Sequence, residues 1–373
     1  MKTLRKAQAK RFRNYLILFI SVFLFLNFPF NLNAQFAEES ARAAYDLRMD
    51  GEILYARAML QKLINQQKTE GGLVHYEMAR TRDHQQLGGA NLNPNGIITS
   101  TKRAVEEDPE SVLFAVADAG ARFGKAYVSM MQEGKTAGED IIEAIESLEK
   151  VLKLDPDFHE VRVHLVEIYS QLPEDLAGDK EMAEVHASYL EEKDLYFGLL
   201  AREAMLPDSV SRVDFWKEKS EKNKKDTRIA VKLGKAYLLD GNIKEARPLF
   251  ESAMNEDPKY NILLLHIARY HMYQVMWDQG KAGEELPLAE TAIKQYLESE
   301  PEPIAPLKAW AIGKLATFSK FQGKEEEFDR LIKEAVALDP SFSKASGLPG
   351  FDLYVPPGEI YRSGDYETFL RPF

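Results

Sequence analysis

Few residues of this sequence have the types and spacing that catalysis or metal binding would require. His159 and His164 are five positions apart, whereas a helical zinc motif places its two histidines four apart. Five residues turn a helix by about 140° beyond a full turn, so the two rings diverge. His266 and His271 have the same spacing. We predict no metal site on a single helix and interpret His164 and His266 as groove-lining or partly buried packing residues. A metal site assembled from residues of several helices is the remaining alternative.

The segment Gly120–Ala126, GARFGKA, has part of the pattern of a phosphate-binding loop. Its glycines are one residue too close for that motif, and Ala126 stands where serine or threonine would contact Mg²⁺. The segment also lies in a helical pattern, whereas a phosphate-binding loop follows a strand. We interpret Gly124 as a position of close helix packing, and we predict no nucleotide and no other cofactor.

Nucleophilic and acid–base chemistry has no recognisable site either. The chain has no cysteine, which removes thiol catalysis and disulfides, and it has no G-x-S-x-G elbow. Carboxylates are abundant, but the series Glu143, Glu146 and Glu149 is typical of a solvated helix face. We predict no catalytic residue and a non-enzymatic protein. An enzyme or accessory subunit with an unrecognised site is one alternative.

Residues 1–34 have the layout of a secretory signal peptide. Basic residues from Lys2 to Arg13 precede an apolar run from Tyr15 to Phe30, and the small residue Ala34 follows. The run has 16 residues, short of the roughly 20 that a membrane-spanning helix needs. We predict cleavage after Ala34 and export to the periplasm or beyond the cell, with an uncleaved anchor as the alternative. The ending Leu-Asn-Ala-Gln resembles signal peptides of Bacteroidetes-type bacteria.

The charge of the chain restricts its partners. The formal net charge is −11 over 373 residues, and removal of the basic leader would leave the rest still more acidic. An acidic surface disfavours nucleic acids and anionic membranes. We therefore predict no nucleic-acid partner, and contact with a membrane only through the N-terminal segment if it is not cleaved.

The stretch Thr227–Pro258 predicts a hairpin of two antiparallel helices. Leu233 and Tyr237 are four positions apart, so they share one face of the first helix. Gly234 is small and lets the helices approach closely, and Gly241 lies in a turn where positive φ is needed. The matching stripe of the second helix consists of Ala246, Phe250 and Ala253. Pro258 ends the unit because proline lacks an amide hydrogen.

This spacing resembles the tetratricopeptide repeat (TPR) pattern L-G-x2-Y…A-x3-F…P. Two positions depart from it: Ala230 stands where the motif has tryptophan, and Pro248 falls early in the second helix, where we expect it to delay or bend the helix. The acidic–proline ending recurs along the chain. Pro156 and Pro258 are 102 positions apart, which is three 34-residue periods.

The same motif marks further units. Phe123, Gly124 and Tyr127 match the first helix of a third unit, and Ala144 and Leu148 match its second helix. The resemblance implies an all-α fold: a right-handed TPR superhelical solenoid of about seven to eight helix pairs over residues 35–340. Glycine-rich insertions are expected in its loops.

Residues 341–373 differ from the repeats. Their prolines and glycines exclude a long helix, yet they carry too many aromatic residues for a free disordered tail. We interpret this irregular C-terminal tail as a cap over the apolar end of the last repeat, which a solenoid requires. The alternative is a segment that lies in the groove or reaches a partner.

In TPR proteins the first helices of successive pairs line a concave groove, so the resemblance implies a protein or peptide partner. The Lys and Asn clamp of one subgroup is not matched here, because its positions are partly apolar. The predicted lining is Lys235, Leu238, Arg269 and Tyr273. A basic and aromatic patch in an acidic protein suits an extended acidic or aromatic peptide.

The sequence thus predicts an extracytoplasmic adaptor or scaffold that binds its partner in this groove. An alternative is a protein that binds a glycan or another cell-envelope polymer through groove aromatics such as Tyr273 and Trp310. The plainest alternative for Lys235 and Arg269 is that they are solvated charges without a partner role.

Overall fold

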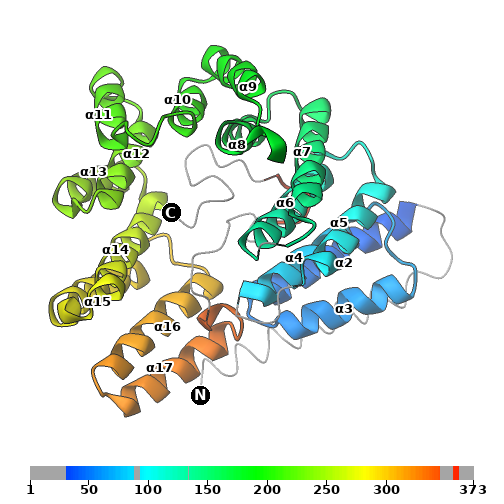
Figure 1. Cartoon of the computed structure of the whole chain (residues 1–373). Helices are drawn as coiled ribbons and strands as arrows, with labels where there is room; N and C mark the ends of the chain where they lie inside the picture. The colour runs from blue at the N-terminus through cyan, green and yellow to red at the C-terminus, as the bar shows by residue number, and fades with distance from the viewer. Residues whose placement is uncertain (1–30, 88–92, 133, 345–355, 361–373) are drawn as a thin grey trace.

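The computed structural model describes residues 31–87, 93–132, 134–344 and 356–360. Within these ranges it contains sixteen α-helices and four short 3₁₀ helices, and no strand. The α-helices follow one another as eight hairpins, and in seven of these the two helices pack against each other (Figure 1); in the remaining one, α10 packs against α8 and α9, and α11 packs against α12. The all-α class and the predicted number of helix pairs are confirmed.

The pairs follow one another along the chain with short connections. Their bounds are α2 Asn31–Met49 and α3 Ile53–Asn65; α4 Leu73–Leu87 and α5 Pro94–Glu107; α6 Val112–Met131 and α7 Ala137–Leu154; α8 His159–Gln171 and α9 Lys180–Lys193; α10 Leu195–Ala204 and α11 Arg212–Lys222; α12 Thr227–Leu239 and α13 Ile243–Glu256; α14 Leu263–Trp277 and α15 Ala282–Leu297; α16 Ala305–Phe321 and α17 Glu325–Leu338. The 3₁₀ helices are η1 Glu174–Leu176, η2 Pro258–Ile262, η3 Gln279–Lys281 and η4 Phe342–Lys344.

The sixth pair, α12 and α13, packs as its sequence predicts. A Cβ atom on Gly234 would lie 2.4 Å from the ring of Phe250, so only glycine allows this approach of the two helices. Phe250 is fully buried. Gly241 in the connecting turn has φ +79°. Pro248 does not delay α13, which already begins at Ile243 and contains the proline on its exposed side.

The third pair does not follow the predicted motif in its first helix. Tyr127 is 54% exposed, and a Cβ atom on Gly124 would meet no atom within 4 Å. The interpretation of Gly124 as a close packing position was therefore wrong. The helix α6 is longer than its counterparts and buries Phe114, Ala115 and Ala119 in its first half instead.

The acidic residue of the recurring acidic–proline ending has a defined structural role. The carboxylate of Asp155 accepts a hydrogen bond from the amide of Asp157, and that of Asp257 accepts one from Lys259. Asp339 accepts from both Ser341 and Phe342. Each carboxylate thereby satisfies backbone amides just after a second helix ends, as a helix-capping residue does.

Apolar packing continues from pair to pair along the array. One buried cluster extends through α12, α13, α14, α15, α16, α17 and η4, and another extends from α6 to α12. Tyr237 packs against both. A small cluster on α4, α5 and α6 centres on Tyr76 and Phe114, and another holds α2, α3 and α4 together.

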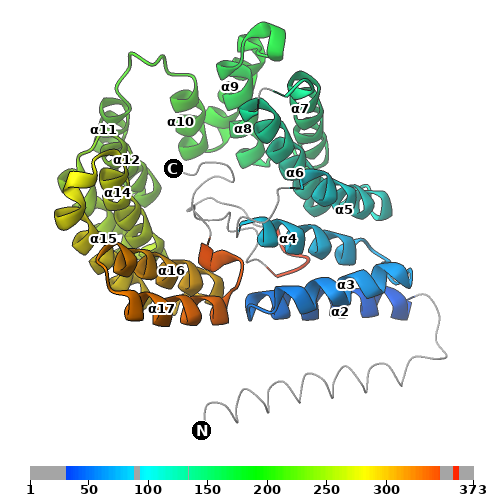
Figure 2. The ribbon, with the colours of Figure 1, turned by 60° about the horizontal axis from the view of Figure 1, so that its bottom comes forward.

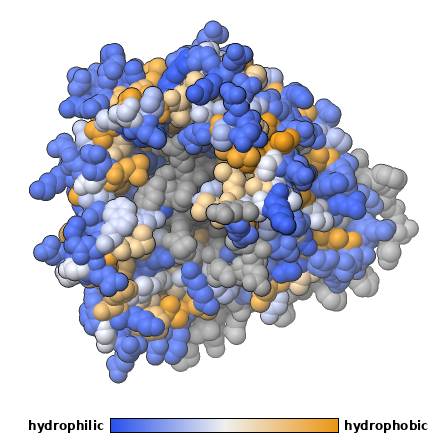
Figure 3. All heavy atoms as spheres, viewed as in Figure 1, coloured by the Kyte–Doolittle hydropathy of each residue, from blue (hydrophilic) through white to orange (hydrophobic). Residues whose placement is uncertain are grey.

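The eight pairs curve into a ring in which the first and last pairs meet (Figures 1 and 2). Helix α4 lies beside η4, and His84 contacts Asp339 across 255 positions of sequence. From α6 onward, the first helix of each pair lies on the inner side of the ring. Figure 3 shows a mostly hydrophilic circumference on this face.

The predicted signal peptide lies largely outside the described residues, and its expected cleavage site after Ala34 falls within α2. None of the described helices is long and apolar enough to cross a membrane.

Only two parts of the 341–373 tail are described. Phe342 at its beginning is fully buried against the last pairs. Farther along, Pro357 is buried, and Ile360 packs against the cluster that extends from α6 to α12.

Candidate functional site

The predicted partner-binding residues lie on two neighbouring first helices. Lys235 and Leu238 are on α12, and Arg269 and Tyr273 are on α14. Lys235 follows Leu233-Gly234 as Arg269 follows Ile267-Ala268, so the two cations hold the same position in successive repeats. Lys235 and Tyr273 are half-buried, whereas Arg269 is buried, with only 3% of its surface exposed. Leu238 is buried in the apolar cluster of these pairs and offers a partner little surface.

Helix α16 adds a third cation that the sequence did not single out. Lys314 lies close enough to Arg269 for their charges to interact, and burial, followed by the charge of Arg269, lowers the pKa of Lys314 to about 8. Its ammonium group lies 5.1 Å from the centre of the Trp310 ring. We call Lys235, Arg269 and Lys314 the basic row. Lys314 stands at a different motif position from the other two, so no spacing rule marks it in the sequence.

Two aromatic residues with exposed surface accompany the basic row. A third aromatic residue, beside Lys314, is buried. Tyr273 packs against Trp277 with ring centres 5.9 Å apart, and Trp277 is 73% exposed. Trp310, which the glycan alternative names, is fully buried. It therefore cannot stack on a ligand, and that alternative is left with Tyr273 and its neighbour.

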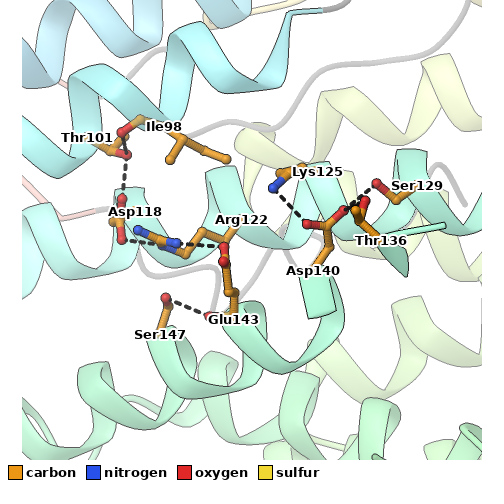
Figure 4. Close-up of polar contacts among 10 residues, drawn as sticks. All are labelled: Ile98, Thr101, Asp118, Arg122, Lys125, Ser129, Thr136, Asp140, Glu143 and Ser147. Atoms are coloured by element: carbon orange, nitrogen blue, oxygen red, sulfur yellow. Dashed lines mark hydrogen bonds and ion pairs between the residues drawn. The ribbon is translucent and has the colours of Figure 1, made fainter. Parts of the chain in front are cut away.

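The segment Gly120–Ala126 takes part in a structural polar network, which Figure 4 shows. It lies inside α6, and Lys125 forms an ion pair of 2.7 Å with Asp140 on α7. Asp140 also accepts hydrogen bonds from Ser129 and Thr136. Burial would raise the pKa of Asp140, but these hydrogen bonds, with that from Lys125, outweigh it and lower the pKa. The lysine thus holds two helices together, as a structural ion pair.

The same network extends to the preceding helix pair. Arg122 pairs with Asp118 at 2.7 Å and with Glu143 at 3.0 Å. Asp118 in turn accepts a hydrogen bond of 2.6 Å from Thr101 on α5. Glu143, which we interpreted as part of a solvated face, is half exposed and paired. The network ties α5, α6 and α7 without leaving a convergent set of reactive groups.

The histidines are distributed as packing residues. His164 is buried with its ring 6.3 Å from that of Phe123, and the ring of His159 lies 5.2 Å from that of Phe197. Burial lowers the pKa of His271, against the effect of its hydrogen bond to Glu285. Among the described residues, no three histidine, aspartate or glutamate side chains gather in a way that could hold a metal ion.

An open depression lies where α11, α12 and α13 meet η2. Polar and charged residues line it, and several of them pair with one another: Arg228 with Asp226 at 2.8 Å, and Thr227 with Glu256. The depression is wide open to solvent, whereas a small-ligand site buries most of its ligand. The basic row is therefore the better candidate site in the described part of the chain.

A model of the tetratricopeptide repeat family matches residues 138–158. These residues form α7 and the connection to α8. Over this stretch the chain resembles the tetratricopeptide repeat family. The all-α array of helix pairs agrees with that resemblance, so the predicted family likeness and fold class are confirmed.

Solved structures of TPR proteins resemble the array. A TPR protein from Parabacteroides merdae is 15% identical, with 82% of this chain and 93% of the other covered and a TM-score of 0.33. The C-terminal part of a TPR protein from Cytophaga hutchinsonii is 15% identical over 82% of this chain and 97% of the other, with a TM-score of 0.27.

Human IFIT1, solved as a dimer with PPP-AAAA, is 16% identical over 81% of this chain and 71% of the other, with a TM-score of 0.36. At these identities and TM-scores, the likenesses carry no argument about function. A comparison with curated proteins found no match.

Proposed function

We propose that this TPR protein is a non-enzymatic scaffold that binds an extended acidic or aromatic polypeptide along the first helices of its last three pairs. The basic row carries this proposal. In a chain with a net charge of −11, three successive first helices each carry one cation of the row: Lys235, Arg269 and Lys314. We further propose that the protein acts outside the cytoplasm, on the strength of its N-terminal sequence.

The order of the basic row along the array suits an extended chain. Lys235, Arg269 and Lys314 lie on successive first helices, so an extended polypeptide that crosses α12, α14 and α16 would set acidic side chains against the row. The half-buried Tyr273 beside the exposed Trp277 provides an apolar surface for an aromatic side chain of the partner.

A capture experiment with matched variants tests this function. The mature chain is immobilised and exposed to envelope extract, and retained proteins are identified by mass spectrometry. The partner should be retained by the wild type but not by Lys235→Ala combined with Arg269→Gln. Lys333→Ala, on the exposed side of the outer helix α17, serves as the control.

A synthetic peptide of known composition tests whether the site binds acidic and aromatic side chains. A synthetic peptide of alternating glutamate and tyrosine should bind the wild type about tenfold more tightly than the double variant, a difference of about 1.4 kcal/mol. Circular dichroism melting confirms that the variants fold. Equal affinity for all variants would refute the basic row as the binding site, and binding of envelope polysaccharide instead would favour the glycan alternative.

A further inference from the structure

The ring closes through a small group of direct contacts between the first two pairs and the end of the last pair. Nε2 of His84 lies 2.6 Å from a carboxylate oxygen of Asp339, and both side chains are fully buried. The His84 ring also stands edge-on to Phe342, with centres 6.1 Å apart. On the other side of this contact, Gly51 lies so close to Leu338 that an added Cβ would be 1.8 Å from its carbonyl oxygen. We call these contacts the seam.

The hydrogen-bond partners of His84 indicate which of its two ring nitrogens donates across the seam. Nη1 of Arg48 lies 3.4 Å from Nδ1 of His84. A guanidinium can only donate, so Nδ1 accepts, and Nε2 carries the proton that it donates to Asp339. Arg48 also bonds Glu77 at 2.8 Å, with both side chains fully buried. A buried polar chain thus runs from Glu77 through Arg48 and His84 to Asp339.

The seam differs in kind from the junctions between consecutive pairs. From α6 onward those junctions are filled by apolar clusters that extend across several pairs, and smaller apolar clusters fill the junctions between α2 and α6. Among the described residues, the cluster of the first pairs contains no residue of the last pairs, and the cluster of the last pairs contains none of the first. Across the seam the principal contacts are a hydrogen bond and close backbone packing.

Separating two helix pairs that meet through polar contacts costs less free energy than separating two that meet through an apolar surface of the same size. When apolar surfaces part, they are exposed to water at a cost proportional to their area. When hydrogen-bonded polar groups part, water replaces the lost partner, so the net loss is small. The ring is therefore weakest at the seam.

We propose that the seam is a latch whose opening admits the polypeptide partner to the inner side of the ring. The regulatory part of this inference rests on the proposed function, whereas the opening itself does not. Opening swings the first pairs away from α17 and η4 and leaves the array from α6 to α17 intact, because its apolar clusters do not depend on the seam.

Two glycines at equivalent positions provide a matched test. Gly51 and Gly241 both lie five residues before a buried alanine, Ala56 and Ala246, and have φ values of +81° and +79°. Alanine strains both turns alike, but only at Gly51 would its Cβ strike Leu338, since nothing lies within 4 Å at Gly241. Gly51→Ala should open the ring, and Gly241→Ala should not.

A second pair of variants tests the polar contact itself. Asp339→Asn keeps an oxygen to accept from the amides of Ser341 and Phe342, but its amide group faces the donating Nε2 of His84, so the bond across the seam is lost. Asp257→Asn is the control, because Asp257 caps the amide of Lys259 in the same way without reaching another pair.

Opening is measured as a distance between spin labels on cysteines introduced at Ala58 and Lys333, which are exposed on α3 and α17. The chain has no cysteine of its own. We expect a minor long-distance population in the wild type that becomes dominant in Gly51→Ala and Asp339→Asn and is unchanged in the controls. The absence of any longer distance in the wild type and both seam variants would overturn the proposal.

The consequence for binding is measured with the alternating glutamate–tyrosine peptide. If opening admits the partner, the association rate constant should rise several-fold in Gly51→Ala relative to Gly241→Ala. Equal rate constants with an open ring would refute the admission role. If the peptide binds no form of the protein, the proposed function fails, and the label distances still decide whether the seam opens.

Discussion

Two glycines that fit the same motif show how strongly a residue depends on its surroundings. Gly234 touches the buried ring of Phe250, whereas Gly124 faces open space. Alanine in a helix is favoured over glycine by about 0.5–1 kcal/mol, and overpacking a core costs about 1–3 kcal/mol. The sign of the substitution should therefore differ between the two sites.

We predict that Gly234→Ala lowers the free energy of unfolding by about 1 kcal/mol, because the fully buried Phe250 ring has no room to move. Gly124→Ala should raise it by about 0.5–1 kcal/mol. Urea unfolding followed by circular dichroism measures both changes. A stabilising effect at Gly234 would show that α12 and α13 are less closely packed than described.

A second prediction at the residue scale concerns Lys314. Its pKa falls from 10.5 in the unfolded chain to about 8 in the fold, so the unfolded state binds more protons between these two values. Stability should therefore rise with pH across this window. The contribution of Lys314 opposes folding below about pH 8, where the buried amine must be charged.

The unfolding free energy measured from pH 7 to pH 10.5 tests this effect. Lys314→Met should remove the rise with pH and leave the protein more stable than the wild type at pH 7. Lys320→Met, at an exposed position of the same helix, should leave the rise unchanged. A wild-type profile that is flat over this range would contradict the burial of the charged amine.

At the scale of elements, two second helices carry a proline at the same place. Pro248 is the sixth residue of α13 and Pro287 the sixth of α15, and both are exposed. Neither proline ends its helix, because each helix is fixed by the buried stripe of its opposite face. Each still lacks one backbone hydrogen bond, since proline has no amide hydrogen.

We predict that Pro248→Ala and Pro287→Ala each raise the free energy of unfolding by about 1 kcal/mol or more, up to the roughly 3 kcal/mol by which proline is disfavoured inside a helix. Thermal unfolding of the single and double variants measures the gain. A loss of stability would mean that the prolines match a bend that the neighbouring pairs require.

The positions of the helices could largely be predicted from the sequence, but which residues of each helix are buried could not always be predicted. The spacing of Leu233, Phe250 and Pro258 defined the sixth pair because each residue there has one mechanical task. In α6 the residues of the motif are present, but they do not face the core. A 20-residue helix can pack with different sets of residues buried, and here the buried set is not the one that the motif predicts. The spacing of residues within one repeat does not determine which face is buried, because that depends on the helix pairs packed on either side.

The candidate site was predictable only in part. Lys235 and Arg269 follow from the repeat, because equivalent positions on successive first helices face the same way. Lys314 and the polar chain from Glu77 to Asp339 do not follow from it, since they depend on how helices distant in sequence meet. Ring closure depends on the curvature summed over eight pairs, which no single repeat encodes.

At the scale of the whole molecule, the apolar clusters predict uneven stability. The cluster that holds α2, α3 and α4 is small and rich in alanine, whereas the cluster from α12 to η4 is large and includes buried Trp310 and Tyr296. Less apolar area buried means less free energy lost on local opening. The first pair should therefore open before the last three.

Hydrogen exchange followed by mass spectrometry tests this order. Amides of α2 and α3 should exchange at least about tenfold faster than those of α14 and α16, a difference of 1.4 kcal/mol in opening free energy. Gly51→Ala should widen the gap by removing the support of the seam. Uniform protection around the ring would contradict a weak first pair.

The contact between His84 and Asp339 can form only late in the synthesis of the chain. Its residues are separated by 255 positions, which a ribosome elongating at about 5–20 residues per second crosses in roughly 13–51 seconds. Throughout that interval the newly made first two pairs must hold Arg48 and Glu77 together without the last pair. A chaperone that recognises nascent chains would meet this protein as an open arc, and only the completed chain can become a ring.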